Sequence, residues 1–227
     1  MSTSASDRAI ITDSLGVGLA TGAYGISFGA LGTAAGLSVW QTCVMSLLMF
    51  TGASQFAFVG VVASGGSPIT GAVTSVLLGG RNLFYGVSLA RLLDVHGWRR
   101  PVTAQFVIDE STAMAVTRDS SHQARVAFYW TGISIFVLWN LFTFVGALAG
   151  TAIGDPRDFG LDAAVGAAFL ALLWPRLDSA LTRVVAIAGA AVALGLVPLT
   201  PAGIPIIVGG AVAVLVGLLL QRRSEGA

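Results

Sequence analysis

The sequence contains no lysine, a single cysteine and two histidines, and only 10% of its 227 residues are charged. Without lysine there is no G-x-x-x-x-G-K phosphate loop, so the chain is not expected to bind a nucleotide. The lone Cys43 excludes an internal disulfide. No H-E-x-x-H or C-x-x-C motif occurs, so neither a metal site nor a cofactor is predicted. A net charge of +1 gives no reason to expect nucleic-acid binding.

Apolar residues dominate instead. They make up 55% of the chain, whereas a typical soluble domain is about one quarter charged. The mean hydropathy is +0.85, and several apolar runs reach the length of about 18 residues that a membrane-spanning helix needs. We therefore predict an all-α polytopic membrane helix bundle of about six or seven spans, embedded in a lipid bilayer. Residues 1–227 form one domain in this prediction, with a polar N-terminal tail (1–13) and a cytoplasmic tail (221–227).

The first apolar run, residues 15–37, contains glycines that alternate four and three residues apart. This spacing places them on one stripe of a helix, which predicts close contact with another helix. The run also matches the hydrolase elbow G-x-S-x-G around Ser27, but that motif requires a strand-turn-helix context and a histidine partner. Packing explains the glycines better, and the chain is not predicted to be an enzyme. The stripe consists of Gly18, Gly22, Gly25, Gly29, Gly32 and Gly36.

The second run, residues 39–63, encloses the polar cluster Thr51-Gly52-Ala53-Ser54-Gln55. One interpretation is that these side chains form hydrogen bonds between helices. The other is that Gly52 interrupts the helix and that the cluster binds a polar solute, as in many secondary transporters. A turn follows at residues 64–68, where Ser67 is a plausible N-cap and Pro68 the first residue of the next helix.

The third run, residues 69–92, contains Arg81 followed by Asn82. An ionisable residue inside a span suggests a functional site. The guanidinium of Arg81 suits a substrate carboxylate, but it could equally form an ion pair with Asp109 or Glu110. Those two acids could form a solvated interfacial face, or they could take up protons or bind an amino group. They also offer the acid–base pair that an alternative function, an intramembrane hydrolase, would need.

The arginines of the connecting segments indicate the orientation of the spans. All basic connections can face the cytoplasm only if residues 101–117 enter the membrane without crossing it. Counting on this basis gives about seven spans, with the N-terminus outside and the C-terminus in the cytoplasm. The re-entrant path of residues 101–117 is a hypothesis of this scheme.

Four motifs together resemble the AzlC family of branched-chain amino-acid permeases. They are Gly25-Ile-Ser-Phe-Gly29, Phe50-Thr-Gly-Ala-Ser-Gln-Phe56, Gly80-Arg-Asn-Leu-Phe-Tyr-Gly86 and the pair Asp109-Glu110. The resemblance covers residues 16–117 and implies a multi-pass protein of the bacterial inner membrane. It also implies export of leucine, isoleucine or valine with a small AzlD-type membrane protein as partner. Because the chain lacks a nucleotide site, an ion gradient is the expected energy source. Transport of another small solute is the alternative.

An amino-acid substrate needs polar groups for its zwitterion and an apolar pocket for its side chain. The phenylalanines of the second and third runs are suited to the pocket. Asp109 and Glu110 are the residues expected to couple protons or ions. The residues expected to bind substrate are Thr51, Gly52, Ser54, Gln55, Phe56, Arg81, Asn82 and Tyr85.

Overall fold

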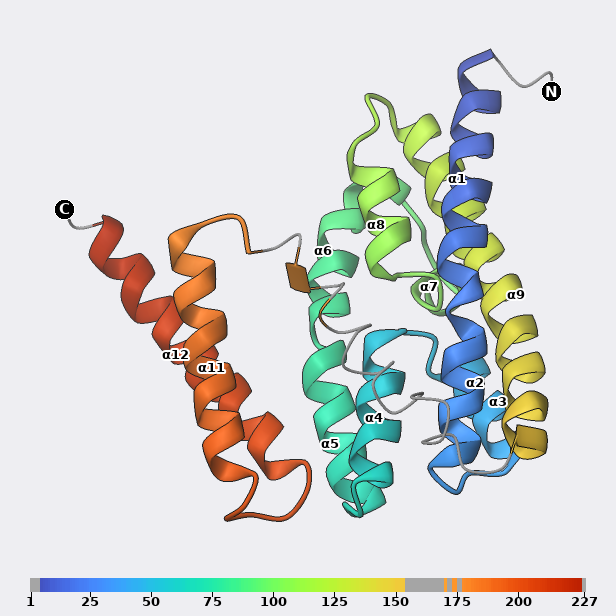
Figure 1. Ribbon diagram of the computed structural model, residues 1–227. Coiled ribbons are helices and arrows are strands. Elements are labelled where there is room, and N and C mark those ends of the chain that lie inside the picture. The colour runs from blue at the N-terminus through green and yellow to red at the C-terminus, as the bar shows by residue number, and fades with distance from the viewer. Residues whose placement is uncertain (1–4, 154–169, 171–172, 175–176, 226–227) are drawn as a thin grey trace.

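The computed structural model of the protein describes residues 5–153, 170, 173–174 and 177–225. Regular secondary structure within these residues is helical, which confirms the all-α prediction (Figure 1). Helix α1 starts within the segment predicted as a polar tail, and Ile10 there is buried. The helices are α1 (Ala5–Ala23), α2 (Gly25–Ala34), α3 (Val39–Leu48), α4 (Ala53–Ala63), α5 (Pro68–Gly79), α6 (Arg81–Leu93), α7 (Arg99–Ala104), α8 (Asp109–Val116), α9 (Ser121–Ile153), α11 (Ala180–Leu196) and α12 (Ile204–Glu225).

The α1–α2 pair packs along α9 through the glycine stripe. A Cβ added at Gly25 or Gly29 would collide with backbone atoms of α9, and one at Gly32 would collide with Thr42 of α3. Gly18, Gly22, Gly25, Gly29 and Gly32 therefore lie in close contact with α9 or α3, as a packing role requires. Gly36 differs, because no described residue lies within 4 Å of an added Cβ there, and its φ is +91° just after the end of α2.

Helices α3 and α4 form a hairpin that enters the bundle from one end and returns to it. Thr42 of α3 lies against Gly32 near the end of α2, and Ser46, one turn further, lies 3.4 Å from Thr143 of α9. The chain then reverses, and α4 runs back beside α5 (Figure 1). The predicted interruption at Gly52 is confirmed, but the second run does not cross the bundle as the span count assumed. The direction of a chain after a break depends on tertiary packing, which periodicity does not encode.

Helices α7 and α8 form a second hairpin that enters from the opposite end (Figure 1). The segment leaves α6 at Asp94 and rejoins the bundle at the start of α9, where Arg125 lies 3.9 Å from Asp94. Between these points it reaches the middle of α9, since Phe106 packs against Gly132 and Phe136. This course agrees with the re-entrant path predicted for residues 101–117.

Helix breaks gather halfway along the bundle. Two helical stretches of the described residues, Asp7–Ala34 and Ser121–Ala152, are long and apolar enough to cross a membrane. The other helices that contribute to the bundle are shorter, and α5 gives way to α6 at Gly80. Residues 49–52 and 105–108 are the tips of the two hairpins.

Helices α11 and α12 form an antiparallel pair that contacts α5. Their connection lies at the end of the bundle where α4 turns into α5, because Gly66 lies against Ala202 and Gly203 against Thr70. The start of α1 and the end of α12 therefore lie at the same end of the molecule (Figure 1). This differs from the prediction of termini on opposite sides, because the α3–α4 run does not cross. Helix α12 extends to Glu225, into the predicted tail at 221–227.

Candidate functional site

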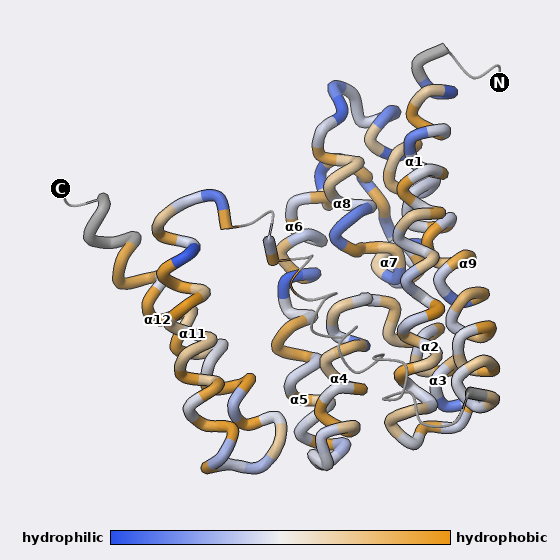
Figure 2. The backbone as a smooth tube through the Cα atoms, viewed as in Figure 1, coloured by the Kyte–Doolittle hydropathy of each residue, from blue (hydrophilic) through white to orange (hydrophobic). Residues whose placement is uncertain are grey.

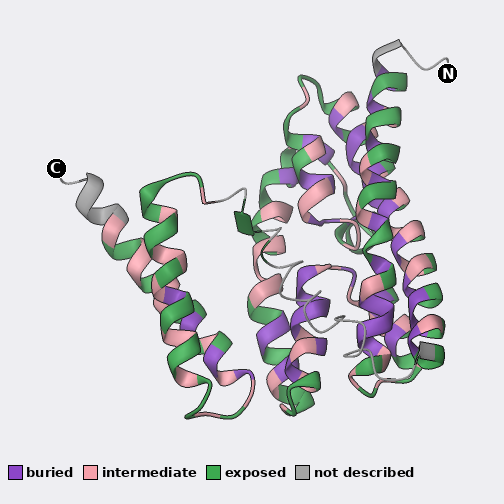
Figure 3. Ribbon diagram, in the orientation of Figure 1, coloured by how far each residue is buried: buried purple, intermediate pink, exposed green. Residues whose placement is uncertain are grey.

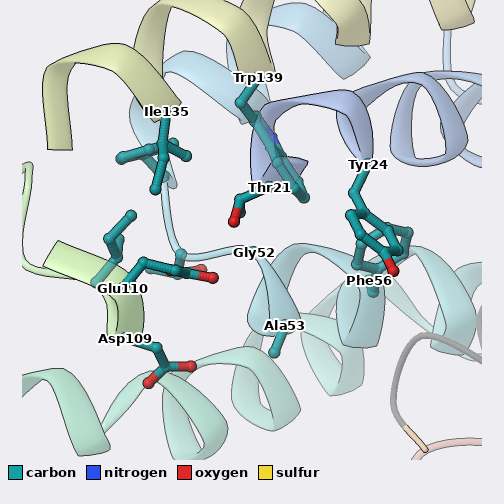
Figure 4. Close-up of a pocket in the computed structure, with 12 residues that line it drawn as sticks. Thr21, Tyr24, Gly52, Ala53, Phe56, Asp109, Glu110, Ile135 and Trp139 are labelled. Carbon is teal, nitrogen blue, oxygen red and sulfur yellow. The ribbon is translucent and has the colours of Figure 1, made fainter. Parts of the chain in front are cut away.

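A cavity of about 230 Å³ lies where the tips of the two hairpins meet (Figure 4). Among the described residues, six segments contribute to it: the α1–α2 junction, the first hairpin tip, the start of α4, the second hairpin tip, the start of α8 and the middle of α9. Its lining is mostly apolar. The residues are Thr21, Tyr24, Phe50, Thr51, Gly52, Ala53, Phe56, Ile108, Asp109, Glu110, Ile135 and Trp139.

The first tip is shaped by Gly52, whose φ of 62° and ψ of −92° are accessible to glycine and strained for other residues. The side chain of Gln55 fixes this turn, because its Oε1 accepts a hydrogen bond from the Gly52 amide at 3.1 Å. Gln55 is fully buried and does not line the cavity. Its role in the structure is thus to cap α4, whereas the sequence suggested a substrate ligand.

The second tip, residues 105–108, is capped in the same way as the first. Ser111 occupies the third position of α8, as Gln55 does in α4, and its Oγ accepts from the Ile108 amide at 3.2 Å. The hydroxyl of Ser111 in turn donates to the carbonyl oxygen of Phe106. Asp109 and Glu110 occupy the first turn of α8, where the helix dipole favours negative charge.

Arg81 forms an ion pair with Asp109, at 2.9 Å between Nη2 and Oδ2. The pair joins the start of α6 to the start of α8, and its side chains are 24% and 18% exposed, respectively. Of the two interpretations left open for Arg81, the structure favours the ion pair. The side chain of Glu110 reaches into the cavity toward Thr21 and Gly52. The side chain of Asp109 points away from these two residues (Figure 4).

An aromatic cluster surrounds the apolar part of the cavity. Phe56 packs edge-on against both Phe28 and Trp139, with ring centroids 5.6 and 6.1 Å apart. Trp139 is 4% exposed, and within the described part of the chain its Nε1 has no hydrogen-bond partner. The Thr51 hydroxyl also lies buried without a partner there, so the lining offers both a donor and a hydroxyl to a bound molecule.

The structure brings together part of the predicted site. Of the ten residues, five line the cavity: Thr51, Gly52, Phe56, Asp109 and Glu110. Arg81 is joined to it through Asp109. Ser54, Gln55, Asn82 and Tyr85 lie outside the described lining.

Sequence reasoning missed the contributions of α1 and α9. Thr21 lies next to the glycine stripe and Trp139 next to Asn140, and only the packing of α1 on α9 turns them toward one cavity. The elbow motif around Ser27 has no catalytic context. It lies inside α2, and both histidines interact with aspartates elsewhere, His96 with Asp94 and His122 with Asp7.

Many hydrophobic positions of the bundle are also exposed, as the hydropathy and burial colours of Figures 2 and 3 show. Leu48, Phe84 and Val87 are exposed by 75% or more. Such a surface suits lipid rather than water. Together with helices that break around a central cavity, it defines an all-α membrane protein. More particularly, the chain belongs to the AzlC family, described as AzlC protein, which matches residues 16–153.

The chain is also similar to several curated proteins. An uncharacterized membrane protein of Archaeoglobus fulgidus is 31% identical over 184 residues, which are 78% of this chain and 80% of that protein. The branched-chain amino acid transport protein AzlC of Bacillus subtilis is 24% identical over 65% of this chain and 59% of its own length. The inner membrane protein YgaZ of Escherichia coli is 27% identical over 95% of this chain and 90% of its own length.

The chain spans less than two thirds of the length of some relatives that it matches, the Bacillus subtilis protein among them. The matched family segment ends with α9, so it contains both hairpins and every described residue of the cavity lining. No solved structure matches the chain.

Proposed function

We propose that this protein is the transport subunit of an exporter for branched-chain and similar hydrophobic amino acids in the bacterial inner membrane. The observation that carries the proposal is the cavity at the meeting point of the two hairpins. The name of the Bacillus subtilis relative supports the choice of substrate. The inner-membrane location draws support from the name of the Escherichia coli relative.

The cavity suits such a substrate in size and chemistry. A volume of about 230 Å³ exceeds the cavity of roughly 150 Å³ that binds benzene in an engineered protein, so an aliphatic amino acid fits by this measure. Phe50, Phe56 and Ile135 offer apolar contacts for its side chain. Glu110 suits its ammonium group, and the Thr51 hydroxyl near the positive end of the α4 dipole suits its carboxylate.

The distribution of arginine supports a cytoplasmic C-terminus. In the described residues, the connections at the α4–α5 end of the bundle (35–38, 64–67 and 197–203) contain no charged residue. The opposite end, which has both the start of α1 and the end of α12, is rich in arginine, and arginine-rich connections stay in the cytoplasm. Its arginines include Arg8, Arg99, Arg100, Arg118, Arg125 and Arg183.

In this orientation the α3–α4 hairpin enters from outside and the α7–α8 hairpin from the cytoplasm. Movement of one hairpin at a time would open the cavity to one side, as alternating access requires. The sequence has no nucleotide-binding motif, so an ion gradient is the proposed energy source. A small AzlD-type membrane protein is the proposed partner, on the strength of the family resemblance.

Efflux of labelled leucine from preloaded cells tests the proposal. The chain is expressed alone and together with an AzlD-type protein, and labelled glutamate is the control for leakage. We expect leucine efflux to be faster than in cells without the chain, while glutamate efflux is unchanged. If the partner is required, the faster efflux should occur only when both proteins are expressed. Leucine efflux no faster than in cells without the chain, in both cases, would count against the proposal.

A further inference from the structure

The chain has five tryptophans, and the structure describes all of them. Trp40, Trp98, Trp130 and Trp174 are exposed by 45% or more. Trp139, in contrast, is 4% exposed and lines the cavity. Its surroundings therefore differ from those of the other four tryptophans.

The indole nitrogen of Trp139 is a buried hydrogen-bond donor. Among the described residues, no group accepts a hydrogen bond from its Nε1. A buried tryptophan usually has a partner for this N–H group, because an unpaired donor keeps its desolvation cost and gains nothing in return. The ring reaches from α9 into the cavity (Figure 4). The donor is thus available to an acceptor on a molecule bound in the cavity.

Packing fixes the orientation of this donor, because other aromatic rings hold the indole on two sides. Phe28 of α2 stacks on it, with ring centroids 6.1 Å apart and an angle of 26° between the planes. Phe56 of α4 meets it edge-on at 6.1 Å. The backbone of Trp139 is also fixed, since a Cβ added at Gly25 of α2 would collide with its carbonyl oxygen. The N–H group is therefore held in place before a ligand arrives.

The start of α4 adds further donors near this ring. Phe56 belongs to the first turn of α4, so its contact with Trp139 brings the indole to the N-terminal end of that helix. Ala53, the first residue of α4, lines the cavity, and the first amides of a helix have no acceptor within the helix. The Thr51 hydroxyl also lines the cavity without a partner among the described residues. These donors and the dipole of α4 favour an anionic group at this point.

We propose that Trp139 is a specificity-determining residue, whose indole N–H donates a hydrogen bond to the carboxylate of the substrate. This inference rests on the proposed function. In this arrangement the carboxylate lies between the indole and the start of α4. A neutral group in the same place accepts a weaker hydrogen bond than a carboxylate does. The site therefore selects amino acids over amides and amines of similar shape.

The test is isothermal titration of the purified full-length chain in detergent with leucine and with leucinamide, in which a neutral amide replaces the carboxylate. Trp139→Phe keeps an aromatic ring but removes the N–H group. We expect it to bind leucine at least about tenfold more weakly than the wild type does, and leucinamide less than about threefold more weakly. Trp130→Phe, on the same helix but 45% exposed, is the matched control and should bind both ligands as the wild type does.

A second measurement observes the donor itself, and it provides the test if Trp139→Phe does not fold. The wild type is labelled with nitrogen-15 at its indole groups and studied by nuclear magnetic resonance. The N–H signal of Trp139 should move downfield when leucine is added, and much less when leucinamide is added. Phenylalanine variants of the four exposed tryptophans identify this signal by elimination.

The outcomes separate the two proposals. If the wild type binds leucine but the Trp139 signal does not move, the donor role of Trp139 is overturned and the proposed function stands. The same holds if folded Trp139→Phe binds leucine as tightly as the wild type, or loses affinity for leucine and leucinamide equally. A wild type that binds no hydrophobic amino acid would overturn the proposed function and this inference with it.

Discussion

The side-chain amide of Gln105 donates a hydrogen bond of 2.8 Å to the carbonyl oxygen of Leu47, and this bond joins the two hairpins. Gln105 directly follows α7, while Leu47 belongs to the last turn of α3. The hairpins enter from opposite ends, so their inward arms contact each other beside the cavity. A movement of either hairpin must therefore change the site that both of them form.

The Arg81–Asp109 pair should couple the stabilities of α6 and α8. Because its side chains are 24% and 18% exposed, we expect a coupling energy of about 1–3 kcal/mol, below the cost of breaking a fully buried pair. Arg81→Gln and Asp109→Asn should each lower the thermal stability of the purified protein more than the double variant does.

The control for this cycle is the exposed pair of Arg125 and Asp94, 3.9 Å apart. Exposed pairs contribute at most about 1 kcal/mol, so Arg125→Gln should change little. If the effects of Arg81→Gln and Asp109→Asn simply added in the double variant, the pair would not stabilise the fold.

Substitution in the glycine stripe tests the close packing of α2 against α9. A methyl group at Gly29 would lie against the carbonyl oxygen of Thr143, and backbone has little room to yield. We expect Gly29→Ala to destabilise the protein by about 1–3 kcal/mol, measured as a lower melting temperature in detergent.

Gly16, in the preceding helix, has nothing within 4 Å of an added Cβ and serves as the matched control. Alanine is a better helix former than glycine, so Gly16→Ala should be neutral or stabilise by up to about 1 kcal/mol. Equal effects at the two positions would contradict the close contact of α2 with α9.

Substitution of Gly52 tests whether the backbone conformation at the tip of the first hairpin matters for stability and transport. No atom of the described neighbours lies within 4 Å of an added Cβ, so the cost of Gly52→Ala comes from its φ of +62° and should be about 1–3 kcal/mol. We expect slower leucine efflux together with lower stability. Gly60→Ala, inside α4 and equally open, should keep both properties, and a Gly52→Ala protein with wild-type properties would argue against a strained tip.

Cysteine labelling in intact cells tests the course of the hairpins. In a Cys43→Ser background, Arg99→Cys and His122→Cys should react with an impermeant reagent only after the cells are opened. Ser64→Cys, in the turn between α4 and α5, should react from outside. Labelling of Arg99→Cys and His122→Cys from opposite sides would mean that the α7–α8 segment crosses the membrane.

Local signals predicted much of the fold. Ser67 and Pro68 start α5 as expected, with the Ser67 hydroxyl accepting from the Thr70 amide at 3.1 Å. Gly52 was recognised because a glycine within a polar cluster weakens a helix. Spacing alone predicted the contact face of α1 and α2, because steric contact depends on which side of the helix lacks side chains.

The cavity itself was less predictable. Gln55 and Ser111 each cap a helix at a point where the chain reverses its direction. Sequence periodicity does not encode such reversals. Ser54 lies in the predicted cluster, yet its hydroxyl lies next to Gly79 of α5, and its backbone carbonyl oxygen accepts a hydrogen bond from the Ser75 hydroxyl. Trp139 joins the site only because α9 passes both hairpin tips, which is a property of the whole bundle.

The central claim, that the cavity between the hairpin tips binds a hydrophobic amino acid, is tested most directly by filling it. Ile135 lines the cavity and is 1% exposed, whereas Ile133 on the same helix is 45% exposed. In proteoliposomes that contain the purified chain, with its partner if required, exchange of labelled leucine should be lost in Ile135→Trp and preserved in Ile133→Trp. Wild-type exchange in Ile135→Trp, with the protein folded, would contradict the claim and locate the substrate elsewhere.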